Sequence, residues 1–509
     1  MLPGRIGPTA ANFPTSFSIL FSSDLIFFML ISICMLMFKK IKPLIMDLWI
    51  SWWNIVCLLR PAFSRARTFL WFLLVLVAFA VRNDLLGVTS FVRALGLSER
   101  CYEPLLHFFH SDAVKADRLA QLWFDIVIKR FPVYKVDGRP VLILDGIKNS
   151  KEGRKMPGVK YLHQQSESNS KPHFIMGHSF QAFGVLCQVR GYFFCVPVCA
   201  RIHEGIVTSN RDRRTLIDKA NEMLASVCQS QRFILLADAY YANGKVILSM
   251  KGRSCELVTR VRCSTTGWRP AAVPRKRKRG RPKKYGDPVK LRNLFGTGGF
   301  SSIPSPVYGE RNIVVRFKSM DLLWKPVGAM VRFVLVDHPT RGRITLLTTD
   351  LTLEAQEIIL LYSLRFKIEV AFKQAVHSVG SFGYHFWMAA MRPLKRRNGN
   401  QYLHRTPEEY RKQVRRKMHA YHVFVQTGMI AQGMLQYLAM TREDLVWKYF
   451  GTWIRTIRPD VLPSEMIVSA ALKNTLPEFL HHGGKASVFR KFILDKIDFS
   501  RSESSRFAA

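Results

Sequence analysis

Two short apolar runs, each followed by an aspartate, constrain the fold of this chain most. Residues 141–144 (VLIL) run directly into Asp145, and residues 233–236 (FILL) precede Asp238 with one alanine between. A continuous apolar run of this length is typical of a strand that is buried on both faces. A carboxylate at the end of such a strand lies at the rim of the sheet, where open α/β folds bind ligands and metals. Each aspartate taken alone is more often a turn former or a helix N-cap.

The pattern around these runs predicts an α/β chain in several parts. We expect strands at 174–189, 192–202 and 257–261, and helices at 211–228 and 240–250. Residues 263–350 break this order with Pro, Gly and a charge run, and then with strands at 312–317, 329–336 and 344–348. The expected parts are a helical region at 1–135, an α/β core at 136–262, a strand-rich insertion at 263–350, a core helix within 351–390, and a basic helical region at 391–509.

A third carboxylate, Glu369, lies in a helix expected at 353–379. At 100° per residue, Tyr362, Arg365, Glu369 and Lys373 share a face about 80° wide. An ion pair between Glu369 and Lys373 on a solvated helix is the alternative explanation of this pattern. Three carboxylates that converge at a sheet edge would suit Mg²⁺, which prefers oxygen ligands.

The charge of the chain predicts a polyanionic partner. Lys and Arg number 76 against 36 Asp and Glu, which gives a formal net charge of +40, while 48% of the residues are hydrophobic. A chain this rich in apolar residues is not a disordered basic tail, and a surface field of one sign opposes compaction unless phosphates neutralise it. Nucleic acid and an anionic membrane are therefore the first candidates. Basic residues concentrate at 275–284 and at 392–417.

A membrane anchor is the less favoured interpretation. The apolar stretches at 25–38 and 69–81 are both shorter than the 18 or more residues that a span needs, so we expect buried helices instead. The nine cysteines include no pair at the spacing of a zinc knuckle, which indicates a reducing compartment and buried thiols.

The order Asp145, Asp238, Glu369 resembles that of the DDE transposases of bacterial insertion sequences, in the subgroup with the Tyr-x2-Arg-x3-Glu signature. The segments VLILDGIKNSKEGRKMPGVK, FILLADAYYANGK and LLYSLRFKIEVAFKQ carry the similarity, which covers about 136–385. The resemblance implies an RNase H-like catalytic fold and Mg²⁺, with Mn²⁺ as a possible substitute. It also implies binding of terminal inverted repeats and target DNA, strand cleavage and transfer, a homodimer that holds two DNA ends, and a cytoplasmic location at the bacterial nucleoid. The helical region at 1–135 would then bind DNA ends.

The resemblance also implies roles for single residues. Asp145, Asp238 and Glu369 would be metal ligands, and Tyr362 and Arg365 would contact DNA near the cut. The subgroup has a lysine seven residues after the glutamate, where this chain has Val376. We assign the role of that lysine to Lys373, which lies on the same helix face.

Further DNA contacts are expected in basic segments. Residues 279–282 (RGRP) resemble an AT-hook, and the alternative is a flexible loop that contacts phosphates without sequence preference. Lys148 would lie near the active-site rim or in an ordinary solvated loop. For His385 and Trp387 we expect core packing at the end of the catalytic helix, and the alternative is a ring beside the cut that stacks on a flipped base. The residues assigned to DNA binding are Lys148, Arg279, Arg281 and Lys283.

Two other functions fit the same sequence. One is a non-catalytic DNA-binding protein that keeps the fold of a decayed element, and the other is an RNase H-like nuclease that acts on branched DNA. The three carboxylates argue against the first. Cleavage of terminal-repeat DNA compared with branched DNA separates the second from a transposase.

Overall fold

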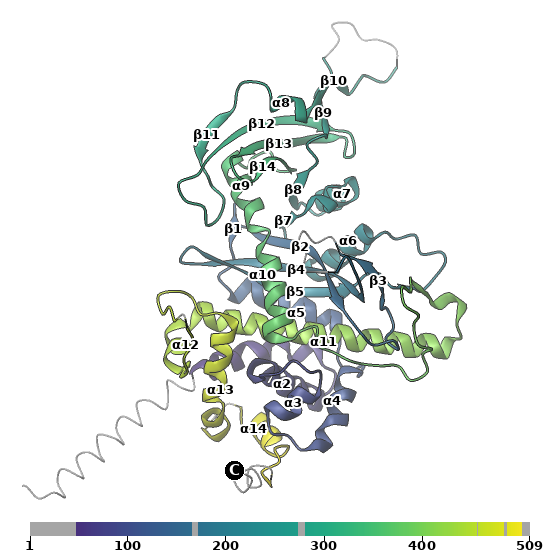
Figure 1. Cartoon of the computed structure of the whole chain (residues 1–509), viewed down its shortest axis with the longest axis vertical. Helices are drawn as coiled ribbons and strands as arrows, with labels where there is room; N and C mark the ends of the chain where they lie inside the picture. Colours follow the sequence, from purple (N-terminus) through teal and green to yellow (C-terminus); the bar gives the residue numbers. More distant parts are fainter. Residues whose placement is uncertain (1–46, 165–171, 273–279, 456, 483–485, 501–509) are drawn as a thin grey trace, which may run out of the picture.

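The computed structural model describes residues 47–164, 172–272, 280–455, 457–482 and 486–500. Along its long axis, a strand-rich end is followed by the central part of the sheet and then by a body of helices (Figure 1). The apolar stretch at 25–38 and the residue Arg279 lie outside the described residues.

The centre of the molecule is a mixed sheet with β2 (Arg139–Ser150) in its middle. β2 pairs antiparallel with β4 (Phe174–Val189) and parallel with β7 (Ile234–Ala237). Beyond them, β5 (Tyr192–Ile202) pairs antiparallel with β4, and β8 (Glu256–Val261) pairs parallel with β7. The order across the sheet is therefore β5-β4-β2-β7-β8. The strands predicted at 174–189 and 192–202 are confirmed to the residue, and every residue of β7 is buried as its apolar run predicts.

The prediction that Asp145 ends its strand is wrong. Parallel pairing of β2 with β7 does end at Leu144, opposite Ala237, but antiparallel pairing with β4 continues to Ser150, opposite Gly177. The longer partner strand pairs with the backbone of β2 for the six further residues 145–150, which keeps β2 extended. Asp145 therefore lies just past the last residue that pairs with β7, at a position that still pairs with β4.

Residues 263–350 continue the same sheet beyond β8. β14 (Gly342–Thr348) pairs antiparallel with β8, and β13 (Ala329–His338) pairs with both β14 and β12 (Val314–Trp324). The hairpin of β12 and β13 is longer than predicted, because paired residues reach from Arg316 and Asp337 to Trp324 and Ala329. The shorter elements here are β9 (Thr266–Pro270), β10 (Tyr285–Lys290), α8 (Leu291–Leu294) and β11 (Ser301–Pro304).

The single helix expected at 353–379 is divided. α9 (Ala355–Leu364) and α10 (Lys367–Gln374) are followed by a π-helical turn, η4 (Ala375–Val379). The N–H of Arg365 donates to the carbonyl of Tyr362, three residues back, so the chain tightens between α9 and α10. α10 contacts β2, β4 and β5 and crosses the sheet in front of them (Figure 1).

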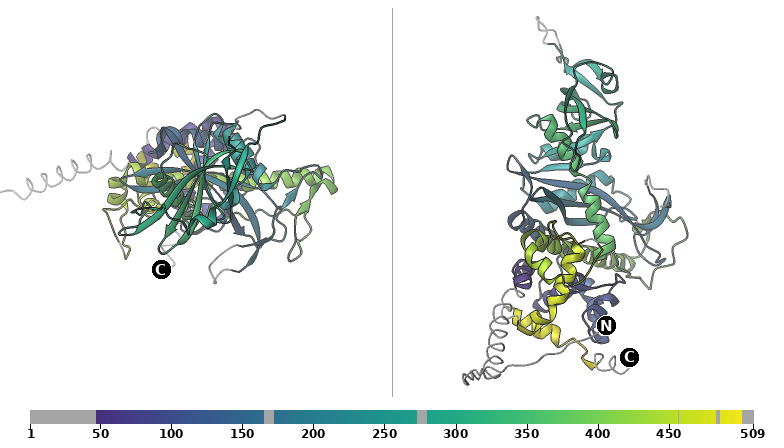
Figure 2. Two further views of the ribbon diagram at one scale, coloured as in Figure 1. Left: turned by 90° about the horizontal axis from the view of Figure 1, so that it is seen from above. Right: turned by 60° about the vertical axis from the view of Figure 1, so that its left-hand side comes forward.

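The helices before and after the sheet pack into one helical body. α2 (Ala66–Val81) contacts both α11 (Glu408–Thr441) and α13 (Glu465–His482), and the rings of Trp49 and Phe479 stack with centroids 5.0 Å apart. Figure 2 shows the yellow C-terminal helices beside the blue and purple N-terminal ones. Every residue from Trp71 to Val81 is buried, as expected for this apolar stretch. Among the described residues, no helix has both the length and the apolar character needed to cross a membrane.

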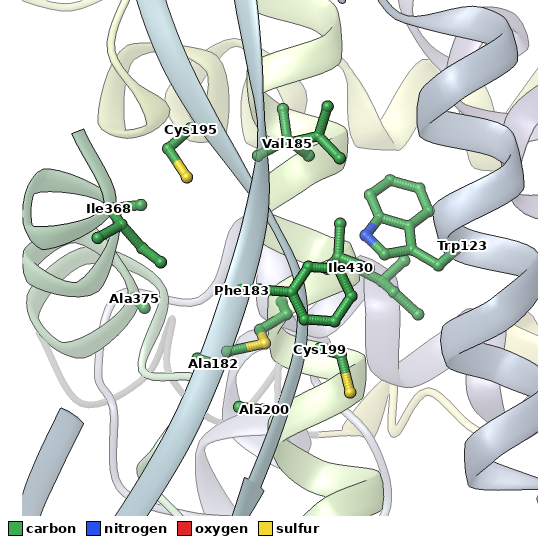
Figure 3. Packing of buried hydrophobic residues seen from close by; sticks show 14 of the residues in the cluster. Trp123, Ala182, Phe183, Val185, Cys195, Cys199, Ala200, Ile368, Ala375 and Ile430 are labelled. Atoms are coloured by element: carbon green, nitrogen blue, oxygen red, sulfur yellow. The ribbon is translucent and has the colours of Figure 1, made fainter. Parts of the chain in front are cut away.

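Further helices complete this body and cover the sheet. Trp123 of α5 (Ala116–Arg130) lies on one side of β4 and β5, and Ile368 of α10 lies on the other (Figure 3). Each described cysteine is a free thiol, and Cys195 and Cys199 are buried as expected. Further helices are η1 (Cys57–Ala62), α3 (Thr89–Ala94), η2 (Glu99–Cys101), α4 (Tyr102–Phe109), α6 (Leu216–Cys228), η3 (Ala239–Tyr241), α7 (Gly244–Lys251), η5 (Leu403–Arg405), α12 (Glu443–Tyr449) and α14 (Ser487–Leu494). The short strands β1 (Lys135–Val136) and β3 (Lys160–His163) pair with β2 and β4 of the main sheet, whereas β6 (Ile206–Val207) and β15 (Gln401–Tyr402) form a separate two-stranded sheet.

Candidate active site

A guanidinium bridges two of the three carboxylates. Arg365, between α9 and α10, donates from Nη1 to Oδ2 of Asp145 at 3.0 Å and from Nη2 to Oε1 of Glu369 at 2.6 Å. The Asp145 and Arg365 side chains are 17% and 19% exposed, whereas that of Glu369 is 55% exposed. The middle strand and the crossing helix are therefore tied together at a half-buried ion-pair cluster.

Asp238 follows β7 directly and is the N-cap of η3. Its Oδ1 accepts a hydrogen bond from the N–H of Tyr240 at 3.0 Å, and its backbone carbonyl accepts from the Thr259 hydroxyl at 2.8 Å. The capping role considered from sequence is present, and it uses one carboxylate oxygen. The backbone N–H of Tyr241 also lies close enough to this carboxylate to stabilise its charged form.

The three carboxylates lie within electrostatic reach of one another. The pKa of Asp145 is raised to about 6, chiefly by burial; Arg365 opposes this rise, and the charges of Asp238 and Glu369 contribute to it. Burial also raises the pKa of Asp238, and Glu369 adds to that shift. A cluster of acids that resist ionisation together is one that a cation stabilises.

Tyr362 and Lys373, which were predicted to share a helix face with Glu369, differ in how far they are exposed. Tyr362 is largely buried, which raises its pKa, and it lies close enough to Arg365 and Asp238 to sense their charges. Lys373 is exposed, one turn beyond Glu369. Within the described residues Glu369 pairs with Arg365 and not with Lys373, so the ion pair of a solvated helix does not form.

Sequence reasoning missed a buried pair beneath the carboxylates. Gln181 lies opposite Gly146 in the pairing of β2 with β4 and donates from Nε2 to the Tyr241 hydroxyl at 3.2 Å. Burial raises the pKa of that hydroxyl, and the charges of Asp145 and Asp238 raise it further. Tyr241 is only 3% exposed and lies close enough to both aspartates to sense their charges. Its position three residues after Asp238 was the available signal.

Arg82, also missed, holds the end of the helix that carries Glu369. It directly follows α2 and is 5% exposed. Its Nη2 donates to the carbonyls of Val379 at 2.6 Å and Gly380 at 3.0 Å, and its Nη1 donates to the Ser90 hydroxyl at 2.8 Å. In the sequence, a lone arginine after an apolar helix gave no indication that it would bind Val379, which lies 297 positions away.

The residues assigned to DNA binding lie outside this cluster. Lys148 is exposed on β2, three positions from Asp145, so its side chain points to the opposite face of the strand, and its Nζ donates to the carbonyl of His163 at 2.7 Å. Arg281 and Lys283 are exposed just before β10, at the strand-rich end of the molecule (Figure 1).

The expectation of core packing for His385 and Trp387 is wrong. Both residues are exposed, and Trp387 keeps 64% of its surface. The segment after η4 alternates between buried and exposed side chains, with Tyr384, Phe386 and Met388 pointing inward. The two rings that looked like core residues therefore face outward from an extended segment.

The donor set fits a divalent cation in its chemistry. Asp145, Asp238 and Glu369 lie within electrostatic reach of one another, and Arg365 supplies a positive charge to Asp145 and Glu369. In this arrangement no three His, Cys, Asp or Glu side chains of the described residues are grouped so that they could hold a metal ion. The Arg365 guanidinium lies between Asp145 and Glu369, so these two carboxylates are paired with a cation of the chain itself.

Part of the chain matches a known protein family. Residues 58–297 match the model of a family described as DDE superfamily endonuclease. That span contains Asp145 and Asp238 and ends before Glu369. A comparison with curated proteins found no match. The family match supports a nuclease of the DDE type that acts on DNA, and such domains generally use divalent metals.

Proposed function

We propose that this protein is a DNA transposase of an insertion sequence, of the subgroup with the Tyr-x2-Arg-x3-Glu signature. It would bind the terminal inverted repeats of its element and catalyse Mg²⁺-dependent strand cleavage and strand transfer. The observation that carries this proposal is the convergence of Asp145, Asp238 and Glu369 around Arg365, at the point where β7 stops and β2 continues. The order β5-β4-β2-β7-β8, with β4 antiparallel to its neighbours, supports an RNase H-like core.

Each residue of the cluster has a role in this proposal. Asp145, Asp238 and Glu369 would hold Mg²⁺, with Mn²⁺ as a substitute, and the bound ions would activate the attacking oxygen and stabilise the leaving oxygen of a phosphodiester. Arg365 neutralises the carboxylates in the metal-free chain and is placed to contact a phosphate at the cut. Tyr362, packed beside it, would position that contact, and Lys373 would reach a phosphate one turn further along the helix.

The remaining parts of the proposal concern DNA and assembly. The N-terminal helices would bind the element ends, and the basic residues before β10, including Arg281 and Lys283, would hold DNA at the strand-rich end. Two ends must be joined in one complex, so we propose a homodimer. The protein would act on chromosomal DNA at the nucleoid of a bacterial cytoplasm.

The test is cleavage of the DNA that flanks the coding sequence, in Mg²⁺ and in Mn²⁺. Asp145→Asn, Asp238→Asn and Glu369→Gln should each reduce cleavage at least about 1,000-fold while leaving DNA binding intact, because each removes a charge from the cluster that would hold the metal. Glu354→Gln is the matched control, since this exposed carboxylate lies just before α9 and should keep full activity. Wild-type cleavage by any one of the three variants would refute the site.

The substrates decide between this function and its alternatives. Cutting at the inverted repeats, followed by joining to target DNA, supports a transposase. Cutting of branched DNA alone would indicate an RNase H-like junction nuclease. Binding without cleavage in either metal would indicate an inactive DNA-binding protein.

A further inference from the structure

The chain beyond the candidate site forms a compact projection, which we call the basic lobe. It consists of residues 151–163, residues 380–405 and the first turns of α11, and it includes β3 and β15. The segments are joined by backbone hydrogen bonds, from the Leu394 N–H to the Arg154 carbonyl and from the Tyr161 N–H to the Asn398 carbonyl, both at 2.8 Å. In Figure 1 the lobe lies at the right, where the N-terminal end of α11 and the green loop above it lie near β3.

The surface of the basic lobe carries positive charges that the protein does not neutralise. Six exposed cations of the lobe make no hydrogen bond, ion pair or ring contact with a described residue. By contrast, Arg411 and Arg415 on the same surface both pair with Glu408. Like charges gathered on one projection repel each other unless an anion binds there. The six are Arg392, Lys395, Arg396, Arg397, Lys412 and Arg416.

A buried network holds the backbone beneath these cations. Lys151 is 5% exposed; its Nζ donates to the carbonyls of Phe382 and Tyr384 and lies 3.9 Å from the centroid of the Tyr384 ring. His178 is fully buried, and its ring nitrogens lie 2.7 Å from the Tyr384 hydroxyl and 2.9 Å from the Pro157 carbonyl. A segment with little regular secondary structure is thus ordered before any partner binds, which lowers the entropy cost of binding.

Strand register places the lobe close to the candidate active site. Asp145 lies opposite Ala182 on β4, and both Ser150 and Lys160 lie opposite Gly177. The five residues from Asp145 to Ser150 span about 17 Å of extended strand. At 3.4 Å per base pair, this is the length of about five base pairs of duplex DNA.

We propose that the basic lobe binds the phosphate backbone of duplex DNA beside the cleavage point, without regard to base sequence. The idea that this DNA is a substrate rests on the proposed function, whereas binding itself does not. The ligand is a regularly spaced polyanion, because the cations are spread over a loop and the start of a helix and none of them faces a closed cavity. The lobe would hold DNA from about five base pairs beyond the cut outward.

The experiment compares two variants of the full chain that lose the same charge. The lobe variant is Arg392→Ala, Lys395→Ala, Arg396→Ala and Arg397→Ala. The control variant is Lys448→Ala, Arg455→Ala, Arg458→Ala and Lys491→Ala, four exposed cations of the C-terminal helical part. Affinity for a linear duplex is measured between about 50 and 200 mM salt, in chelator, so that no cleavage is needed.

The salt dependence is the decisive readout. Each lost phosphate contact lowers the slope of log K against log salt by about 0.9, so the loss of four contacts should lower the slope by about 3.6 and weaken binding at least about tenfold at low salt. The lobe variant should lose the same affinity for repeat-containing and for scrambled duplexes. On repeat-containing duplexes that end within about five base pairs of the cut, it should bind as well as the wild type. Replacing Arg392, Arg396 and Arg397 by Lys should restore both slope and affinity, which excludes misfolding as the cause.

Two outcomes would overturn the inference. One is a lobe variant whose slope of log K against log salt equals that of the wild type, or whose slope and affinity equal those of the control variant. The other is a lobe variant that loses binding to anionic phospholipid vesicles while its DNA binding is unchanged, which would assign the lobe to a membrane. A third outcome separates the two proposals. If the wild type cuts no DNA but the lobe variant still shows a smaller slope of log K against log salt, the proposed function fails and the lobe assignment stands.

Discussion

Single buried residues decide how the candidate site is held. The Arg82 guanidinium, at the end of α2, contacts the faces of Phe79 and Phe91 at 4.4 and 4.8 Å and caps the carbonyls that end η4. Burial lowers its pKa to about 9, which still leaves it charged at neutral pH. A buried charge that satisfies several carbonyls couples the N-terminal helices to the helix of Glu369.

The variant Arg82→Met tests this coupling. It removes the cap, so the Val379 carbonyl loses its bond from Arg82 and the Gly380 carbonyl keeps only the bond from the Gly383 N–H. The unfolding free energy should therefore fall by about 3 kcal/mol. Metal-dependent DNA cleavage should fall as well, because the helix that positions Glu369 would fray at its end. Urea titration measures the stability, and cleavage is assayed at a temperature where the variant is folded.

The matched control for this prediction is Arg93→Met. Arg93 pairs with Asp84 on the surface nearby, and its side chain is 53% exposed. Surface ion pairs contribute about 0–1 kcal/mol, so this variant should remain close to wild type. Equal stabilities of the two variants would show that the buried cap has no special role.

At the scale of elements, the close approach of α11 to the sheet depends on glycine. A Cβ on Gly433 would lie 2.4 Å from Cζ2 of Trp123 and 3.1 Å from Cγ1 of Val196. Trp123 is itself fixed, because its indole N–H donates to the Pro197 carbonyl at 3.0 Å. The helix, the tryptophan and β5 therefore fit together only with no side chain at this position.

Gly433→Val should force α11 away from α5 and β5. The overpacking should cost about 1–3 kcal/mol in unfolding free energy, even though helix propensity alone would favour replacing the glycine. Thermal or urea unfolding measures the change. Gly399→Ala, at an exposed position where a Cβ meets nothing within 4 Å, should leave stability unchanged; a neutral Gly433→Val would contradict the packing argument.

At the scale of the whole molecule, the excess charge of +40 makes stability depend on the partner. The two helical regions that flank the sheet in sequence form one body in space, so repulsion among their basic residues acts on a single folding unit. A polyanion that binds only the folded chain should stabilise it by mass action.

We therefore expect duplex DNA to raise the melting temperature. At about 100 times the dissociation constant the gain should be about 2.7 kcal/mol, and it should shrink as salt weakens binding. Thermal melting with and without DNA, at about 50 and 300 mM salt, measures both effects. A shift that does not change with salt would show that charge neutralisation is not its source.

The sequence by itself determined the local elements and the types of residue at the site. Strand-like runs rich in apolar and aromatic residues predicted β4 and β5 to the residue, and the short apolar run of β7 predicted a strand buried along its whole length. They also located Asp145 and Asp238, and helical spacing put Arg365 and Glu369 on one face. These features depend on neighbours within a few positions.

Only the tertiary structure decided which distant residues meet. The extension of β2 past Asp145 depends on the length of β4, and the pairing of Glu369 with Arg365 instead of Lys373 depends on where Asp145 lies. The bond from Arg82 to Val379 joins residues 297 positions apart. Such contacts follow from how elements pack, which a periodic pattern does not encode, because the same pattern buries its apolar face equally well against several partners.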